Sequence, residues 1–228
     1  MMDIIAAHRR SLAAALSTLT ADQWRGPSLC AGWTPAHVLA HLTMPFRISE
    51  PDFMAGLQRC GGDFTKFSDE IAARDSKLRP ADLVDVLREN ADNPWAPPGG
   101  GLTGALSHDV IHGLDITWPL AMPQEIPASA MTIVLDSITS PLALDAGEVR
   151  AAEISAAEKG AEAGHTTLFG FPLSGIRVRA TDLDWSAGDG EELAGRSRDL
   201  LPLLAGRLVP GELFHGPGVA RAWTLADR

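Results

Sequence analysis

The spacing of apolar residues changes along this 228-residue chain, and this change constrains the fold more than any other feature. Up to about residue 140, apolar residues recur at intervals of three and four, as they do on one face of a helix. Around residues 176–181 they alternate with polar residues instead, which is typical of a strand with one buried face. A single regular architecture does not fit both patterns, so we predict two domains of different class.

The stretch between the two patterns, residues 141–165, is rich in alanine, glutamate and glycine and poor in large apolar residues. This composition is typical of a linker or a solvated connection. The length of the chain also exceeds the usual size of one domain. We therefore predict an all-α domain over residues 1–142, a linker over 143–164 and a small α+β domain over 165–228.

Start and stop signals place the individual elements. In LCAGWTPAHVLAHL, residues 29–42, Thr34 can cap a helix and Pro35 suits its first turn. This helix is predicted to run past residue 50, with a possible kink at Pro45. Further helices are expected over residues 2–19, 63–78, 80–90, 102–121, 127–140 and 192–207, with a loop over 93–101 and a closing strand over 218–225.

The charge and the cysteine content exclude several classes of protein. A formal net charge of −10 without a basic stripe argues against a nucleic-acid partner, because that affinity depends on clustered lysine and arginine. The first ten residues fit neither a secretory signal nor a membrane span. Cys30 and Cys60 match neither a disulfide framework nor a thiolate zinc motif. We expect a cytoplasmic protein with reduced cysteines and no membrane or nucleic-acid partner.

One stretch carries the spacing of a metal site. In ALSHDVIHGLD, residues 105–115, His108 and His112 lie four apart, so both side chains project from one helix face with their Cβ atoms about 6 Å apart. Asp115 follows at a spacing that lets it accept the other ring N–H of a histidine and fix its tautomer. His41, on the helix that begins at Pro35, is the best third ligand, because its apolar neighbours turn it toward a bundle interior.

Three neutral imidazoles and a water molecule suit zinc and leave the open position that a catalytic ion needs, although nickel or iron can bind such a set. The spacing does not decide the matter by itself. Two helical histidines often lie at a surface or bond to backbone groups in a core. His37 is also four residues from His41, which makes a second possible pair; we expect it either to flank the site or to contact a ligand without binding the metal.

These residues resemble the mycothiol-dependent maleylpyruvate isomerase family, whose N-terminal domain belongs to the DinB-like superfamily. Three segments carry the resemblance, in the expected order: LCAGWTPAHVLAHL (29–42), HDVIHGLDITWPL (108–120) and VRATDLDWSAGDGEELAGRSRDLLPLLAGR (178–207). The resemblance implies a DinB-like four-helix bundle that holds a divalent metal, followed by a sterol-carrier-like α+β domain. It maps the ligands onto His41, His108 and His112. Isomerase-type members have ExxxH where this chain has HxxxH, so the resemblance does not determine which reaction this chain catalyses.

The resemblance implies mycothiol as the co-substrate and a small electrophile as its reaction partner. The expected function is that of an isomerase or an S-transferase in which the metal activates the thiol. Arg177, Arg179, Arg196 and Arg207 can bind a substrate carboxylate, but none is singled out. Two alternatives stay open: a nonenzymatic module that binds a small ligand and has a structural metal, and a metal-free regulatory partner. The sequence does not predict the oligomeric state.

Overall fold

The computed structural model describes residues 1–123, 125–139 and 166–226, and the chain divides into two compact units, Met1–Ile126 and Pro127–Arg228. The division comes earlier than the expected boundary at residue 142, because α9 (Ala128–Thr139) packs against elements of the second unit. The helix expected over 127–140 is therefore present, but it does not belong to the first unit. The linker expected over 143–164 lies outside the described residues.

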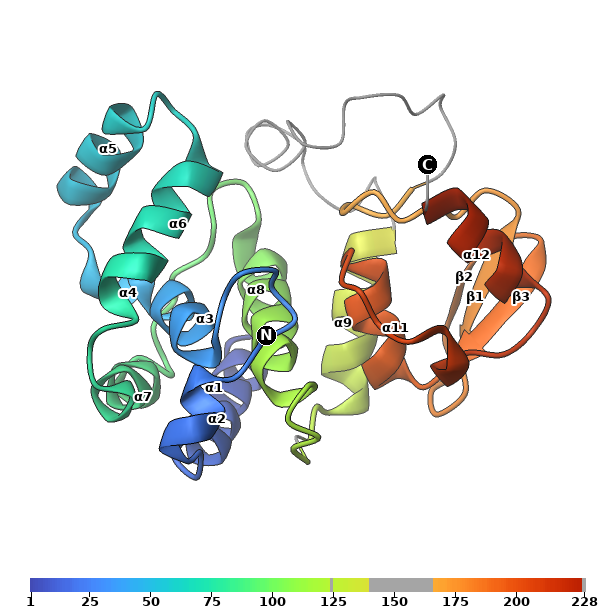
Figure 1. Cartoon of the computed structure of the whole chain (residues 1–228), viewed down its shortest axis with the longest axis horizontal. Helices are drawn as coiled ribbons and strands as arrows, with labels where there is room; N and C mark the ends of the chain where they lie inside the picture. The colour runs from blue at the N-terminus through green and yellow to red at the C-terminus, as the bar shows by residue number, and fades with distance from the viewer. Residues whose placement is uncertain (124, 140–165, 227–228) are drawn as a thin grey trace. The chain divides into compact units, whose positions relative to one another are not determined.

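The first unit is all-α, as predicted (Figure 1). Helix α3 is central to its packing: it contacts α6, α7 and α8, and α1 also packs against α7 and α8. That four of these helices form a DinB-like bundle stays a prediction. The bounds are α1 (Met2–Leu16), α2 (Ala21–Arg25), α3 (Pro35–Leu42), α4 (Met44–Arg47), α5 (Glu50–Arg59), α6 (Phe64–Asp75), α7 (Pro80–Glu89) and α8 (Gly101–Thr117).

Apolar side chains from α1, α3, α7 and α8 form the main core of the first unit. Leu12, Leu39, Leu87 and Ile116 are fully buried there, one from each helix. Their burial removes apolar surface from water, which is the dominant favourable contribution to folding. This core fixes α3 against α8, and these two helices carry the three expected metal ligands.

The long helix expected from Pro35 past residue 50 is wrong, because the structure divides it into α3, α4 and α5. Pro45 lies in the first turn of α4 and lacks the N–H that a continuous helix would need at this position. Ile48 is then extended, with φ −108° and ψ 127°, and the Ser49 hydroxyl accepts the Asp52 N–H at 3.3 Å to begin α5. The sequence signal at Thr34 and Pro35 is correct, since α3 begins at Pro35.

The second unit combines a three-stranded sheet with helices, which agrees with the predicted α+β class. Strand β1 (Ile176–Ala180) lies between β2 (Ser186–Gly188), to which it is antiparallel, and β3 (Glu191–Gly195), to which it is parallel. Ile176, Val178 and Ala180 are buried, as the alternating pattern predicts. Helix α9 packs against β2 and α11 (Ser197–Leu204), and α12 (Gly218–Ala226) packs against β1 and β3. A 3₁₀ turn spans Gly211–Leu213. The likeness to sterol-carrier folds stays a prediction.

Two expectations for the second unit are corrected. Residues 218–225 form α12 rather than a closing strand, because Val219, Ala222 and Trp223 have helical spacing; Ala222 is fully buried. The helix expected over 192–207 begins only at Ser197, since the residues before it form β3. The Asp182 carboxylate accepts the Ser197 N–H at 2.7 Å and caps that helix.

Both cysteines are free thiols, as expected. Cys60 is buried, whereas Cys30 is half-buried and lies close to the candidate metal site. In the part of the chain that the structure describes, no helix combines the length and the apolar character that crossing a bilayer requires.

Candidate metal site

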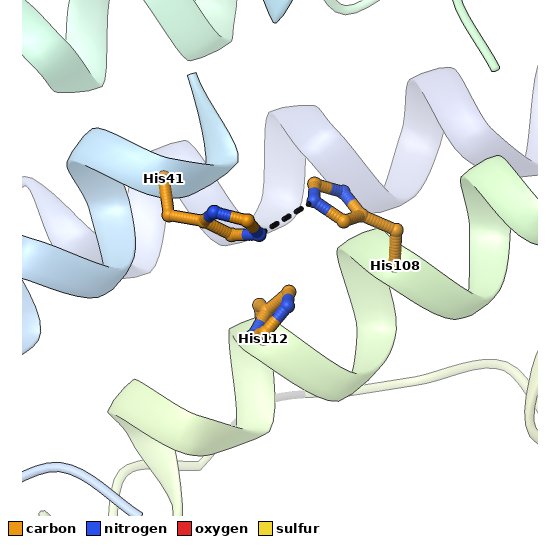
Figure 2. A group of neighbouring side chains, drawn as sticks. All are labelled: His41, His108 and His112. Atoms are coloured by element: carbon orange, nitrogen blue, oxygen red, sulfur yellow. Dashed lines mark hydrogen bonds between the residues drawn. The ribbon is translucent and has the colours of Figure 1, made fainter. Parts of the chain in front are cut away.

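Helices α3 and α8 bring the three expected ligands together. His108 and His112 project from one face of α8, and His41, in the last turn of α3, points between them (Figure 2). One ring nitrogen of each histidine lies within 4.8 Å of one ring nitrogen of each of the other two. The side chains of His108 and His112 are 15% and 18% exposed, so the cluster can be reached from solvent.

The separation of two of the three rings fits a shared zinc ion. Nε2 of His41 and Nε2 of His108 lie 3.2 Å apart (Figure 2). Zinc–nitrogen bonds of 2.0–2.1 Å in a tetrahedron place two ligand nitrogens about 3.3 Å apart. The two rings are thus already at the separation that a shared ion requires. That the cluster binds a metal stays a prediction.

Asp115 is hydrogen-bonded to His112; that it supports a metal ligand stays a prediction. Nδ1–H of His112 donates to Asp115 Oδ2 at 2.8 Å, and Asp115 is only 1% exposed. The same oxygen accepts the Cys30 thiol at 3.0 Å, so Cys30, His112 and Asp115 form a second group of possible ligand atoms that shares His112 with the first. The hydrogen bond to Asp115 leaves Nε2 of His112 as the nitrogen suited to the three-histidine site.

The other two rings have equivalent supports, which sequence reasoning did not identify. Nδ1–H of His108 donates to Asp109 Oδ1 at 3.1 Å, and Nδ1 of His41 lies 2.8 Å from the Ser68 hydroxyl on α6. A hydroxyl can either donate or accept, so Ser68 accommodates either tautomer of His41. Ligand histidines commonly have such a partner on the second ring nitrogen, and here every ring has one.

Asp109 is ionised at neutral pH although it is almost fully buried. Burial alone would raise the pKa of its carboxyl, but the hydrogen bond from His108 and the neighbouring Arg9 guanidinium together lower the pKa below its ordinary value. The carboxylate therefore acts as an acceptor and favours the Nδ1–H tautomer of His108. In that tautomer the Nε2 lone pair of His108 is available toward His41.

Two further histidines of the described chain, His37 and His8, have other contacts. His37 lies at the start of α3, where its Nδ1 accepts the Thr34 N–H at 3.3 Å, and burial lowers its pKa. It thus caps the helix that carries His41 and is not part of the three-histidine group. His8 is buried, and its Nε2 lies 3.2 Å from the Asp109 carbonyl oxygen; burial is the main cause that lowers its pKa.

Two tryptophans border the histidine cluster. The ring of Trp33 lies 5.5 Å from the ring of His41, and the ring of Trp95 lies 5.4 Å from the ring of His108 in an edge arrangement. Trp95 comes from the predicted loop over residues 93–101. Aromatic walls of this kind reduce water access and lower the local dielectric constant around a metal.

Spacing rules explain why three supports were missed. Asp109 directly follows His108, and adjacent helical residues do not normally face each other. Ser68 and Cys30 are far from their partners in sequence, at separations of 27 and 85 residues, so only the packed structure brings them together.

Arg179, one of the arginines expected to bind a substrate carboxylate, forms two hydrogen bonds with Glu192 at 2.9 and 3.0 Å.

Comparisons with known proteins agree with the resemblance drawn from the sequence. Residues 5–95 match the family model of the mycothiol maleylpyruvate isomerase N-terminal domain, a range that includes His41 and ends before His108. Two crystal structures of mycothiol-dependent maleylpyruvate isomerase have the same fold over 95% of this chain and 91% of their own. One has 14% identity and a TM-score of 0.57; the other, a histidine-to-alanine mutant, has 13% identity and a TM-score of 0.56. None of the curated proteins compared with the chain matches it significantly.

Proposed function

We propose that this chain is a metal-dependent enzyme that uses a small thiol. Its first unit matches the mycothiol maleylpyruvate isomerase N-terminal family, and the chain shares the fold of that enzyme. The observation that carries the proposal is the convergence of three imidazoles, each with a hydrogen-bonding partner on Nδ1. The proposed metal is zinc, because three neutral imidazoles and an open fourth position are typical of a catalytic zinc site.

The residues of the chain have distinct roles in this proposal. His41, His108 and His112 would hold the ion, and Asp109 and Asp115 would fix the tautomer and the orientation of two of these rings. A divalent ion in this position would supply a Lewis acid that lowers the pKa of a thiol bound to it. The partial exposure of His108 and His112 supports access of a small thiol to the cluster.

Mycothiol is the proposed thiol, because the matching family and the fold neighbours depend on it. In an isomerase, the thiolate adds to a conjugated double bond, the new single bond rotates, and the thiol leaves again. In a transferase, the new carbon–sulfur bond persists. The HxxxH arrangement of His108 and His112 departs from the family pattern, so both reactions remain within the proposal. A reduced thiol and the free thiols of Cys30 and Cys60 are compatible with action in the cytoplasm.

Calorimetric titration of mycothiol into the full chain tests this function. Zinc-loaded protein is expected to bind mycothiol at one site, and chelator-treated protein is expected to lose that binding, because the proposed thiol site includes the ion. Reloading with zinc should restore it, which controls for damage by the chelator. Equal binding with and without metal would instead support a nonenzymatic ligand-binding module. Native protein that contains no metal and binds none would support the regulatory alternative.

A further inference from the structure

We propose that Arg9 is a positioning residue of the histidine cluster. It holds the ring of His108 in its orientation through Asp109 on one side and through Trp95 on the other. The inference rests on the proposed function, since it gives His108 the role of a ligand. Arg9 lies on α1, has no solvent-exposed surface, and is far in sequence from every residue of the cluster. Its side chain contacts Asp109 and the segment that leads to Trp95, which support the His108 ring from two sides.

The first support is a buried ion pair. Nε–H of Arg9 donates to Asp109 Oδ2 at 2.6 Å, while the other carboxylate oxygen accepts Nδ1–H of His108 at 3.1 Å. Because adjacent helical residues do not normally face each other, the carboxylate reaches His108 only in a restricted orientation. Arg9 holds that orientation and places its positive charge against the buried carboxylate.

The second support is the chain segment that leads to Trp95. Nη1 of Arg9 donates to the carbonyl oxygens of Asn90 and Asn93, at 3.2 and 2.7 Å. Asn93 is two residues before Trp95, whose ring lies edge-on to His108 at 5.4 Å. One guanidinium thus ties the end of α7 to the segment that places an aromatic wall against the His108 ring.

Phe46 reinforces this second support. The Arg9 guanidinium carbon lies 5.1 Å from the centre of the Phe46 ring, which is the range of a cation–π contact. The Phe46 ring in turn meets the Trp95 ring edge-on at 6.4 Å. Arg9 therefore contacts the elements on both sides of His108 without touching the ring itself.

Lysine cannot replace arginine in this role. An ammonium group carries the same charge, but it lacks the planar fork that reaches a carboxylate and two carbonyl oxygens together. Arg9→Lys is therefore the informative variant, because it keeps the charge beside Asp109 and loses the geometry. A purely structural arginine would affect only stability. A positioning arginine also changes the tautomer of His108 and the coordination of a bound ion.

The experiment compares Arg9→Lys with wild type and with Leu83→Ala, a core variant on α7, after measuring the unfolding free energy of each. In the metal-free protein, nitrogen-15 NMR of the His108 ring should show the Nδ1–H tautomer in wild type and Leu83→Ala, and a reduced fraction of it in Arg9→Lys. Zinc affinity should fall about 10–100-fold in Arg9→Lys, the range found when partners of ligand histidines are removed. The visible spectrum of the cobalt-loaded protein should change with it.

Other outcomes separate this inference from the function on which it rests. Arg9→Lys with the wild-type tautomer, zinc affinity and cobalt spectrum would overturn the role of Arg9. Wild type that binds neither zinc nor cobalt would overturn the proposed function, while the tautomer comparison would still test Arg9. If Arg9→Lys does not fold, Asp109→Asn breaks the same connection and should shift the His108 tautomer in the same direction. An unchanged tautomer in that variant would also overturn the inference.

Discussion

Replacing His41, His108 or His112 with alanine is expected to lower zinc affinity more than about 100-fold in each case. Loss of a residue that merely hydrogen-bonds to a ligand costs about 10–100-fold, so loss of the ligand itself should cost more. The variants should remain folded, since the apolar core of α1, α3, α7 and α8 is unchanged. Competition with a zinc-binding dye measures the affinity, and circular dichroism checks the fold.

His37→Ala is the matched control for this series. His37 lies on α3 with His41 but contributes to the helix cap, so its loss should cost about 1 kcal/mol of stability and leave zinc affinity unchanged. If His37→Ala abolished zinc binding while His41→Ala did not, the choice of ligand on α3 would be wrong. Zinc binding that survived in all three ligand variants would show that other residues bind the metal, and the proposed three-histidine site would be wrong.

A chain that ends at Ile126 is expected to fold, to bind zinc like the full chain and to lose thiol-dependent turnover. All three proposed ligands and their hydrogen-bonding partners lie in the first unit, which has its own core. The fold shared with the maleylpyruvate isomerase structures extends over 95% of this chain, so the first unit alone is not expected to sustain the proposed reaction. Circular dichroism, zinc titration and a turnover assay with mycothiol measure the three properties.

His108→Ala in the same truncated chain is the control, and it should lose zinc as it does in the full chain. A truncated chain that is helical and soluble but binds no zinc would show that a ligand comes from the residues after Ile126. Full turnover by the truncated chain would show that residues 1–126 suffice for the proposed reaction.

Features that depend on local spacing were predictable from the sequence. The interval between His108 and His112 places them on one face of α8, and Thr34 and Pro35 correctly mark the start of α3. The alternation at Ile176 and Val178 likewise predicts a buried strand face. In each case the period of the side chains along the backbone determines which residues share a face, so one short segment contains the required information.

Features that depend on tertiary packing were not predictable in this way. Helix α9 has the helical pattern that the sequence predicts, but the pattern does not say which unit covers its apolar face. The same limit applies to Arg9, whose contacts with Asp109 and Asn93 join residues about 100 and 84 positions away. Nothing in the local sequence distinguishes this arginine from a solvated one, and only its burial identifies it.

The most direct test of the account is the number of protons released when mycothiol binds the zinc-loaded protein at pH 7. A free thiol has a pKa near 8.5 and is mostly protonated at that pH, whereas a thiol that coordinates zinc is ionised. Isothermal titration in buffers of different ionisation enthalpy counts the protons. The account predicts a release of about one proton per site. Binding without proton release would show that the thiol does not coordinate the metal, and the proposed activation of the thiol would be contradicted.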